Sequence, residues 1–242
     1  IQAVRFPASY QGFLRGGSTV WAARFHPPTM GTNRRKAAMI RRATPADAEA
    51  LSYLSRTCFT QTFGHLYAPS DLDAFLDEAY SPTVLRAKLD DPERATWLLF
   101  EQSADDAACG VLTPTDHSGT PEPGDEAPAS SVSHAPIGYV TACPAHLPHP
   151  DVAPGDGEVQ RLYILQGHQG GGRGTALLRT ALEWLERDGP RTIWIGVWSE
   201  NYGAQRFYAR HGFEIVGDYS FMVGDHADHE LITRRLPRGL TA

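Results

Sequence analysis

The chain has 242 residues, of which 41% are hydrophobic and 21% charged, and its formal net charge is -6 at pH 7. These values are typical of a soluble globular protein with one large domain or two small ones, and no apolar run approaches the ~18 residues of a membrane-spanning helix. Its 3 widely spaced cysteines indicate neither a disulfide framework nor a zinc site. They fit a reducing compartment, so we expect a cytoplasmic protein.

The charge is distributed unevenly along the chain. Residues 1–38 contain six basic side chains and no acidic ones, whereas the remainder holds 16 Lys and Arg against 28 Asp and Glu. An acidic body does not suit nucleic acid, which needs a basic surface. It is compatible with steering of a cationic small substrate, although solubility alone also explains it.

Residues 1–38 differ in character from the rest of the chain. They lack hydrophobic periodicity, and their arginine-rich, acid-free composition is compatible with a transit peptide. We favour the alternative, an extension that is not part of the domain, because residues 39–44 resemble a natural domain start. The domain is therefore predicted to span residues 39–242.

Helices and two strands are predicted before the centre of the chain. Thr44 is a helix N-cap, followed by Pro45 at the first helical position. Further helices are predicted to begin at residues 69 and 81, and strands to span residues 96–102 and 137–143. The stretch between these strands, residues 103–136, is rich in Pro, Ser, Gly, Asp and Ala. It is predicted to be a long exposed hairpin loop, and we assign it no chemistry.

The centre of the chain, residues 158–186, combines three features. Residues 159–165 form an apolar run of strand length, residues 169–174 form a loop with four glycines, and leucines recur at helical spacing from Thr175 onward. Such a loop between a strand and a helix start suits a phosphate group, because its backbone N–H groups and the helix dipole both favour an anion. Arg173 adds a permanent positive charge.

Known phosphate-loop patterns narrow the choice of ligand. The P-loop pattern fails because Arg173 and Gly174 occupy the positions of its Lys and hydroxyl residues. The dinucleotide pattern fails because Leu177 stands where its third glycine belongs. The pattern Q-x-x-G-x-G fits, with Gln169, Gly172 and Gly174.

The C-terminal part completes an alternating pattern. The sequence predicts a strand at residues 192–198, a short helix at 201–210, and closing strands at 213–221 and 230–235. Gly212 suits the left-handed position that comes after a helix end. The expected fold is α/β, with a mixed central sheet flanked by helices on both faces.

Two segments together resemble a known family. The glycine loop, followed by Asn201-x-x-Ala204-x-x-Phe207-Tyr208, resembles the GCN5-related N-acetyltransferases, or GNAT family. The resemblance covers about residues 39–236, with residues 103–136 as the main departure. It implies the GNAT fold and acetyl-CoA as co-substrate. More narrowly, the stretches FTQTFGHLYAPSDLDAFLDEAYS and FMVGDHADHELI resemble the PaiA-type spermidine/spermine N-acetyltransferases.

The resemblance also implies the roles of individual residues. The cofactor-binding residues would be Leu162, Tyr163, Ile164, Gln169, Gly170, Gly171, Gly172, Arg173, Gly174, Thr175, Asn201 and Tyr208. Strand N–H groups at residues 162–164 are the candidates for holding the oxyanion. Asn201 would meet the pantetheine arm, and Tyr208, near the sulfur, could protonate the leaving thiolate. The alternative for Tyr208 is a core aromatic residue.

A base is needed because an alkylamine is mostly protonated at pH 7. Glu158 lies six residues before Ile164, as a catalytic Glu does in histone-type members of the family, and it is our second catalytic candidate. The alternative is a solvated strand end. We expect no metal: the pairs His146-x-x-His149 and His226-x-x-His229 lack a clear ligand geometry. Cys143 has no evident activating base in the sequence, which argues against an acyl-cysteine route.

The expected reaction is direct attack of a small cationic amine on acetyl-CoA. We favour a polyamine, because the body of the chain is acidic and Asp225, Asp228 and Glu230 add an acidic rim before the last strand. The alternatives are another amine (a peptide N-terminus, an amino acid or a drug) or a non-catalytic acyl-CoA-binding sensor. We expect no nucleic-acid or membrane partner, and a homodimer is left open.

Overall fold

The computed structural model describes residues 38–101 and 135–237. Apart from their last residues, the extension predicted over residues 1–38 and the insertion predicted over 103–136 lie outside the described residues. The strands are β1 (Ala38–Arg42), β2 (Ala95–Glu101), β3 (Gly138–Pro144), β4 (Gly157–Ile164), β5 (Ile193–Trp198), β6 (Glu214–Val223) and β7 (His226–Arg235). The helices are η1 (Pro45–Asp47), α1 (Ala48–Phe63), α2 (Pro69–Tyr80), α3 (Pro82–Asp90), α4 (Arg173–Leu185) and α5 (Tyr202–Ala209).

The strands form one seven-stranded mixed sheet in the order β1-β2-β3-β4-β5-β7-β6. Neighbouring strands are antiparallel except β4 and β5, which run parallel. The register of β4 and β5 pairs Gly157 with Ile193 and Glu158 with Trp194 at their first residues. Both strands continue beyond these pairs, so their carboxyl ends leave open edges in the middle of the sheet.

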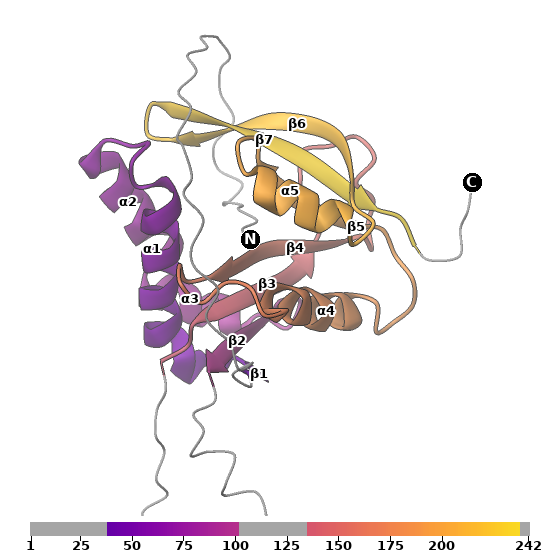
Figure 1. The fold of residues 1–242 in the computed structure, drawn as a ribbon, viewed down its shortest axis with the longest axis horizontal. Helices are drawn as coiled ribbons and strands as arrows, with labels where there is room; N and C mark the ends of the chain where they lie inside the picture. Colours follow the sequence, from indigo (N-terminus) through magenta and orange to yellow (C-terminus); the bar gives the residue numbers. More distant parts are fainter. Residues whose placement is uncertain (1–37, 102–134, 238–242) are drawn as a thin grey trace, which may run out of the picture.

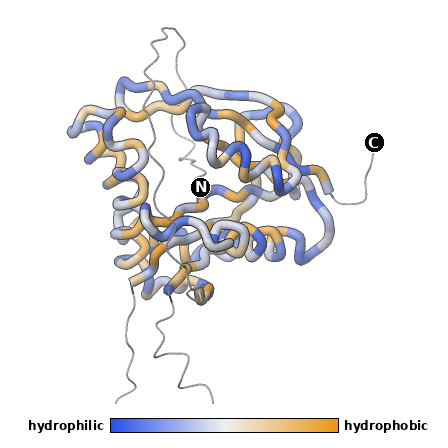
Figure 2. The backbone as a smooth tube through the Cα atoms, in the orientation of Figure 1, coloured by the Kyte–Doolittle hydropathy of each residue, from blue (hydrophilic) through white to orange (hydrophobic). Residues whose placement is uncertain are grey.

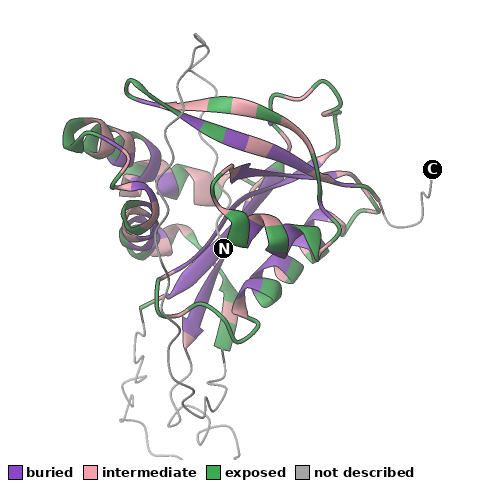
Figure 3. Ribbon diagram, turned by 45° about the horizontal axis from the view of Figure 1, so that its top comes forward, coloured by how far each residue is buried: buried purple, intermediate pink, exposed green. Residues whose placement is uncertain are grey.

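Helices cover both faces of the sheet, as predicted (Figure 1). On one face α1, α2 and α3 pack against β2, β3 and β4 through an apolar cluster that includes Phe59, Phe63 and Tyr80. On the other face α4 and α5 contribute Leu177 and Phe207 to a second cluster. Figure 2 shows the central strands as mainly hydrophobic, and Figure 3 shows that the green, exposed side of α4 and α5 faces solvent.

The first helix is longer than the sequence suggests. Thr44 and Asp47 form a reciprocal capping box around the short 3₁₀ turn η1, which leads into α1. The aromatic stretch at Phe59 and Phe63 is the last part of this helix, and Gly64 is its C-cap. Phe59 and Phe63 therefore lie on the same continuous helix as Ala48.

Two local features were placed differently by the sequence and the structure. The edge strand β1 was not predicted, because its sequence AMIRR is short, ends in two arginines and is mostly exposed. The strand β7 begins at His226, four residues before the predicted start, which changes the setting of Asp228 and Glu230. Within the described ranges, none of the helices is long and apolar enough to cross a membrane.

Candidate active site

The glycine loop has the backbone conformation that its composition predicts. Gly170, Gly171 and Gly172 have φ values of 90°, 60° and 82°, a left-handed region that side chains rarely adopt. Gly172 is the N-cap of α4, and nothing lies within 4 Å of a Cβ built on any of the three. The first turn of α4 therefore presents N–H groups without helical acceptors to an open surface.

Glu101, the last residue of β2, holds the glycine loop in place through Arg173 and His168. Arg173 donates to Glu101 Oε1 at 2.8 Å and to the carbonyl oxygen of His168 at 2.8 Å. The Nδ1 atom of His168 lies 3.2 Å from the same Glu101 oxygen. Gln169 donates to the carbonyl oxygen of Ile164 at 3.2 Å. The Arg173 guanidinium is thus paired with Glu101 and bonded to the loop backbone.

The open end of β4 separates the two faces of the site. Leu162 and Ile164 point into the α4–α5 cluster, whereas Tyr163 points into the α1–α3 cluster. Tyr163 stacks on Tyr139 with ring centroids 5.5 Å apart, and its hydroxyl is buried without a hydrogen-bond partner among the described residues. Where β4 and β5 diverge, the side chains of residues 162–164 therefore lie alternately on the two faces of the sheet.

The short helix α5 brings Asn201 and Tyr208 to the α4 side. The Asn201 side chain accepts a hydrogen bond from the Ala204 N–H at 3.0 Å, so it caps the helix. Tyr208 is fully buried against Phe207 and Phe213, and burial raises the pKa of its hydroxyl. That hydroxyl has no hydrogen-bond partner within the described part of the chain. A buried, protonated and unpaired donor is therefore available on this side.

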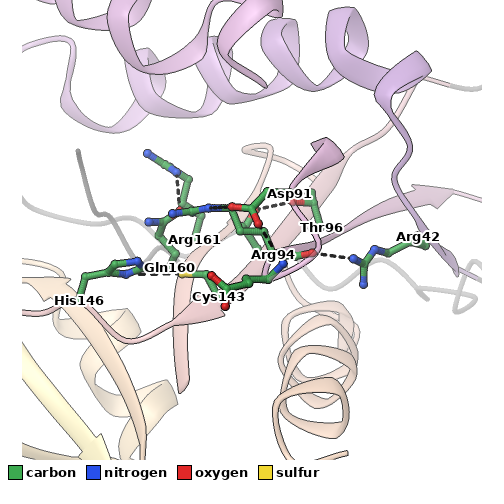
Figure 4. Close-up of polar contacts among 10 residues, drawn as sticks. Arg42, Asp91, Arg94, Thr96, Cys143, His146, Gln160 and Arg161 are labelled. Carbon is green, nitrogen blue, oxygen red and sulfur yellow. Dashed lines mark hydrogen bonds and ion pairs between the residues drawn. The ribbon is translucent and has the colours of Figure 1, made fainter. Parts of the chain in front are cut away.

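Glu158 is not a solvated strand end, because its side chain is 0% exposed. One carboxylate oxygen, Oε2, accepts a hydrogen bond from the His146 N–H at 2.8 Å and lies 3.5 Å from His146 Nδ1. Cys143 Sγ lies 3.9 Å from the same Nδ1 atom, a contact drawn in Figure 4. The structure thus places an imidazole nitrogen near Cys143 that the sequence did not indicate, whereas the expectation of no acyl-cysteine route stays a prediction.

Cys143, His146 and Glu158 offer three donor atoms that lie within 4.8 Å of one another. Three donors from the described residues are fewer than the four of a structural zinc site but match the number of protein ligands in a catalytic one, so the absence of a metal stays a prediction. Elemental analysis of the purified protein should show no stoichiometric zinc, and a chelator should leave its melting temperature unchanged. One zinc per chain that disappears in Cys143→Ala would contradict this prediction and define a metal site.

Two of the three acids of the expected rim are buried within β7, so the rim does not form as predicted. Asp228 is 4% exposed and Glu230 is 1% exposed. The Tyr67 hydroxyl donates to Asp228 Oδ2, and His226 Nε2 lies 3.2 Å from Asp228 Oδ1. Burial raises the pKa of both carboxyl groups, and for Glu230 the shift is large and is increased by the neighbouring Asp228. Asp225, at the hairpin turn, remains exposed.

A cavity of about 350 Å³ lies between α2 and the β6–β7 hairpin. Its wall contains three carboxylates, Asp71, Glu78 and Asp225, and two aromatic rings, Phe75 and Phe221. None of its lining residues is basic. Acidic and aromatic groups around one hollow favour a ligand with positive charge on an apolar frame.

The sequence reasoning missed several members of this face. Tyr67, Asp71 and Glu78 lie in the stretch FTQTFGHLYAPSDLDAFLDEAYS that carries the narrower resemblance, and none of them was predicted as a site residue. The available signal was the i, i+4, i+7 spacing of Asp71, Phe75 and Glu78, which places them on one side of α2. Tyr67 has no such local signal, because its partner Asp228 is 161 residues away in the chain.

Comparison with known proteins gives a consistent picture. The acetyltransferase (GNAT) family model matches residues 50–213. An uncharacterized N-acetyltransferase of Mycobacterium tuberculosis is 39% identical over 80 residues, which are 33% of this chain and 51% of that protein. The chain thus spans about half the length of this curated relative.

Solved structures agree at the level of the fold. The PaiA N-acetyltransferase from Thermoplasma acidophilum, in complex with coenzyme A, has a TM-score of 0.56 at 17% identity, covering 83% of this chain and 99% of that one. The ribosomal-protein-S18-alanine N-acetyltransferase from Escherichia coli has a TM-score of 0.52 at 14% identity, covering 85% and 97%. At these identities the similarity concerns the fold alone.

Proposed function

Because the chain belongs to the acetyltransferase (GNAT) family, we propose that it transfers an acetyl group from acetyl-CoA to a primary amine of a polyamine by direct attack. The donor half of this proposal is carried by the left-handed glycine loop at the start of α4. The N–H groups from Gly170 to Thr175 would hold the CoA pyrophosphate. The pantetheine arm would then run past Asn201 into the divergence of β4 and β5.

Three groups would act in the transfer, two on the thioester and one on the amine. Backbone N–H groups at residues 162–164, on the open length of β4, would stabilise the oxyanion of the tetrahedral intermediate. Tyr208 would protonate the departing thiolate from the α5 side. The base suggested by the family resemblance is Glu158. Its carboxylate is buried beside His146 at the paired end of β4 and β5, so it would act through water.

The acceptor half is carried by the acidic cavity between α2 and the β6–β7 hairpin. A polyamine has several ammonium groups on an apolar chain, and the cavity offers Asp71, Glu78 and Asp225 beside Phe75 and Phe221. The carboxylates would hold distal charges while one terminal amine reaches the thioester. This acceptor agrees with the narrower resemblance to PaiA-type enzymes, which we likewise advance as a proposal.

A thiol-release assay with acetyl-CoA and a panel of amines tests both halves. We expect spermidine and spermine to give a higher kcat/KM than a neutral-tailed arylamine, an amino acid or a peptide with a free N-terminus. A peptide or arylamine that outperforms every polyamine would refute the acceptor and leave the donor proposal intact. Absence of thiol release with all amines would refute the proposed reaction.

Added salt should weaken polyamine capture. Attraction between exposed charges is screened at a Debye length of about 8 Å at physiological ionic strength. The KM for spermidine is therefore expected to rise with added NaCl, and much more steeply than the KM for an alkyl monoamine in the same assay. Equal salt dependence of the two KM values would argue against an acidic acceptor cavity.

A further inference from the structure

Glu230 is a buried carboxyl group, and no cation among the described residues pairs with it. It lies in β7, opposite Trp198 of β5 and Tyr219 of β6, and its side chain is 1% exposed. Its Oε2 atom is buried and has no hydrogen-bond partner among the described residues. Burying such a group without compensation costs several kcal/mol, so an unpaired one is a sign of a ligand or of chemistry.

The strand places Glu230 in line with the acceptor cavity. His226, Asp228 and Glu230 alternate along β7 and so project from the same face, with consecutive side chains about 7 Å apart. Phe221 is directly opposite Asp228, and it lines the cavity. A row of ionisable groups therefore runs from the cavity along β7 toward the centre of the sheet.

The inner end of this row faces the divergence of β4 and β5. Trp198, opposite Glu230, belongs to the same cluster as Tyr163 of β4 and packs on Phe63 at 5.4 Å. Burial raises the pKa of the Tyr163 hydroxyl, and Glu230 is among the nearby groups that add to the rise. Glu230 thus borders the open ends of both strands from the α1 side, whereas Tyr208 approaches from the α5 side.

Asp228 and Glu230 differ in how they are held. Asp228 accepts a hydrogen bond from Tyr67 and pairs with His226, and both contacts favour its charged form. Nothing comparable among the described residues supports Glu230. Asp228 is therefore suited to hold a positive charge, and Glu230 is suited to change its protonation state.

We propose that Glu230 binds the reacting ammonium group of the acceptor and takes its proton, while Asp228 holds the same or the next ammonium group along the chain. This inference rests on the proposed function and names the residue that activates the amine. It moves the role of base from Glu158 to Glu230. It also requires the acceptor to be a cationic alkylamine.

The proton balance of the step is complete. The ammonium group gives one proton to the Glu230 carboxylate, and the neutral nitrogen attacks the thioester carbonyl carbon. As the C–N bond forms and the C–S bond breaks, Tyr208 protonates the departing thiolate. The second nitrogen proton passes to solvent, and solvent returns one proton to the Tyr208 phenolate. The products are the acetamide and free CoA, with one net proton released to solvent through Glu230.

The environment of Glu230 also makes it a better base. Its neighbours are Asp228 on the same strand, Tyr67 after α1 and Tyr163 on β4, and Asp228 in turn faces His226 and Glu200. Burial and Asp228 both raise the pKa of Glu230, which brings it nearer to that of an alkylamine. Because the carboxylate must be ionised to act, kcat/KM should fall as the pH drops through this raised pKa.

Glu158 is the natural residue to compare with Glu230. It lies in the same sheet, at the end of β4 that pairs with β5. Its neighbour Trp194 and the neighbour of Glu230, Trp198, are four residues apart on β5, or about 13 Å. Asp218 provides a matched control. It is an exposed carboxylate on β6 of the same hairpin, paired with His229.

The deciding experiment compares Glu230→Gln, Glu158→Gln and Asp218→Asn in the full chain. Glu230→Gln should lower kcat/KM for spermidine by about 100- to 10,000-fold and leave CoA affinity unchanged. It should also abolish the fall of kcat/KM at low pH, which we call the acidic limb of the pH profile. Asp218→Asn should match the wild type. Calorimetric titration of spermidine into the CoA-bound protein should show that Glu230→Gln weakens binding, and Glu230→Asp, which keeps a carboxylate, should restore part of the lost rate.

Two outcomes would overturn the inference. One is an unchanged acidic limb in Glu230→Gln together with its loss in Glu158→Gln. The other is unchanged spermidine binding and turnover in a folded Glu230→Gln protein. The binding measurement does not depend on turnover, so a wild type that binds spermidine without releasing thiol would refute the proposed reaction separately.

Discussion

Tyr208→Phe is expected to lower kcat by about 100- to 10,000-fold, the usual contribution of a general acid or base. The substitution keeps the ring that packs against Phe207 and Phe213 and removes only the hydroxyl. Burial holds the pKa of this hydroxyl well above its ordinary value, so it stays protonated at neutral pH and can act as a donor. Steady-state kinetics with acetyl-CoA and spermidine would measure the change.

Stability and CoA affinity should change little in the same variant. The Tyr208 hydroxyl has no hydrogen-bond partner in the described part of the chain, so its loss leaves no orphaned group behind. Tyr139→Phe is the matched control, because Tyr139 is another fully buried tyrosine, located in the cluster on the opposite face. If kcat for Tyr208→Phe stayed within about twofold of wild type, Tyr208 would be a packing residue and water would protonate the thiolate.

The parts of the site that the sequence predicts well are those set by local backbone chemistry. Glycine readily adopts left-handed backbone conformations, and Gly172 has one at the N-cap of α4. Gly212 likewise has a φ of 83° after α5. In both places the restriction acts within a few residues, so the pattern is visible in the sequence.

The parts that it predicts poorly depend on packing between distant segments. The sequence predicts the last strand to begin at Glu230, because the polar stretch before it has little strand propensity of its own. With that start, Asp228 and Glu230 are expected to form an exposed rim. Pairing with β5 and β6 extends that strand back to His226 and buries alternate carboxyl groups. Tyr67, which is 161 residues away in the chain, donates a hydrogen bond to Asp228, and a local sequence pattern cannot reveal such a contact.

Glu158 illustrates the same limit for a motif. Its spacing from Ile164 points to a catalytic base by resemblance, yet spacing along a strand does not say what covers the side chain. The segment after β3 does so here: its His146 N–H bonds the carboxylate. Glu158 accepts a backbone hydrogen bond, whereas Glu230 Oε2 has no partner among the described residues. The Glu158→Gln and Glu230→Gln variants test which of the two carboxylates is the base.

Gly172→Val is expected to weaken CoA binding at least about tenfold, which corresponds to about 1.4 kcal/mol. Gly172 has a φ of 82°, and a β-branched residue in that conformation is strained by about 1–3 kcal/mol. The new side chain would also enter the open space above the loop, where the pyrophosphate is proposed to lie. Calorimetry with CoA measures the affinity, and thermal unfolding measures the strain.

Gly167→Val separates these two effects, because Gly167 lies in the same β4–α4 connection, has the same φ of 82° and is equally open around its Cβ position. Both variants should lose similar stability, since the backbone conformation is the same. Only Gly172→Val should lose CoA affinity, since Gly167 lies outside the amides from Gly170 to Thr175. Equal CoA affinity in the two folded variants would place the pyrophosphate elsewhere and remove the glycine loop from the site.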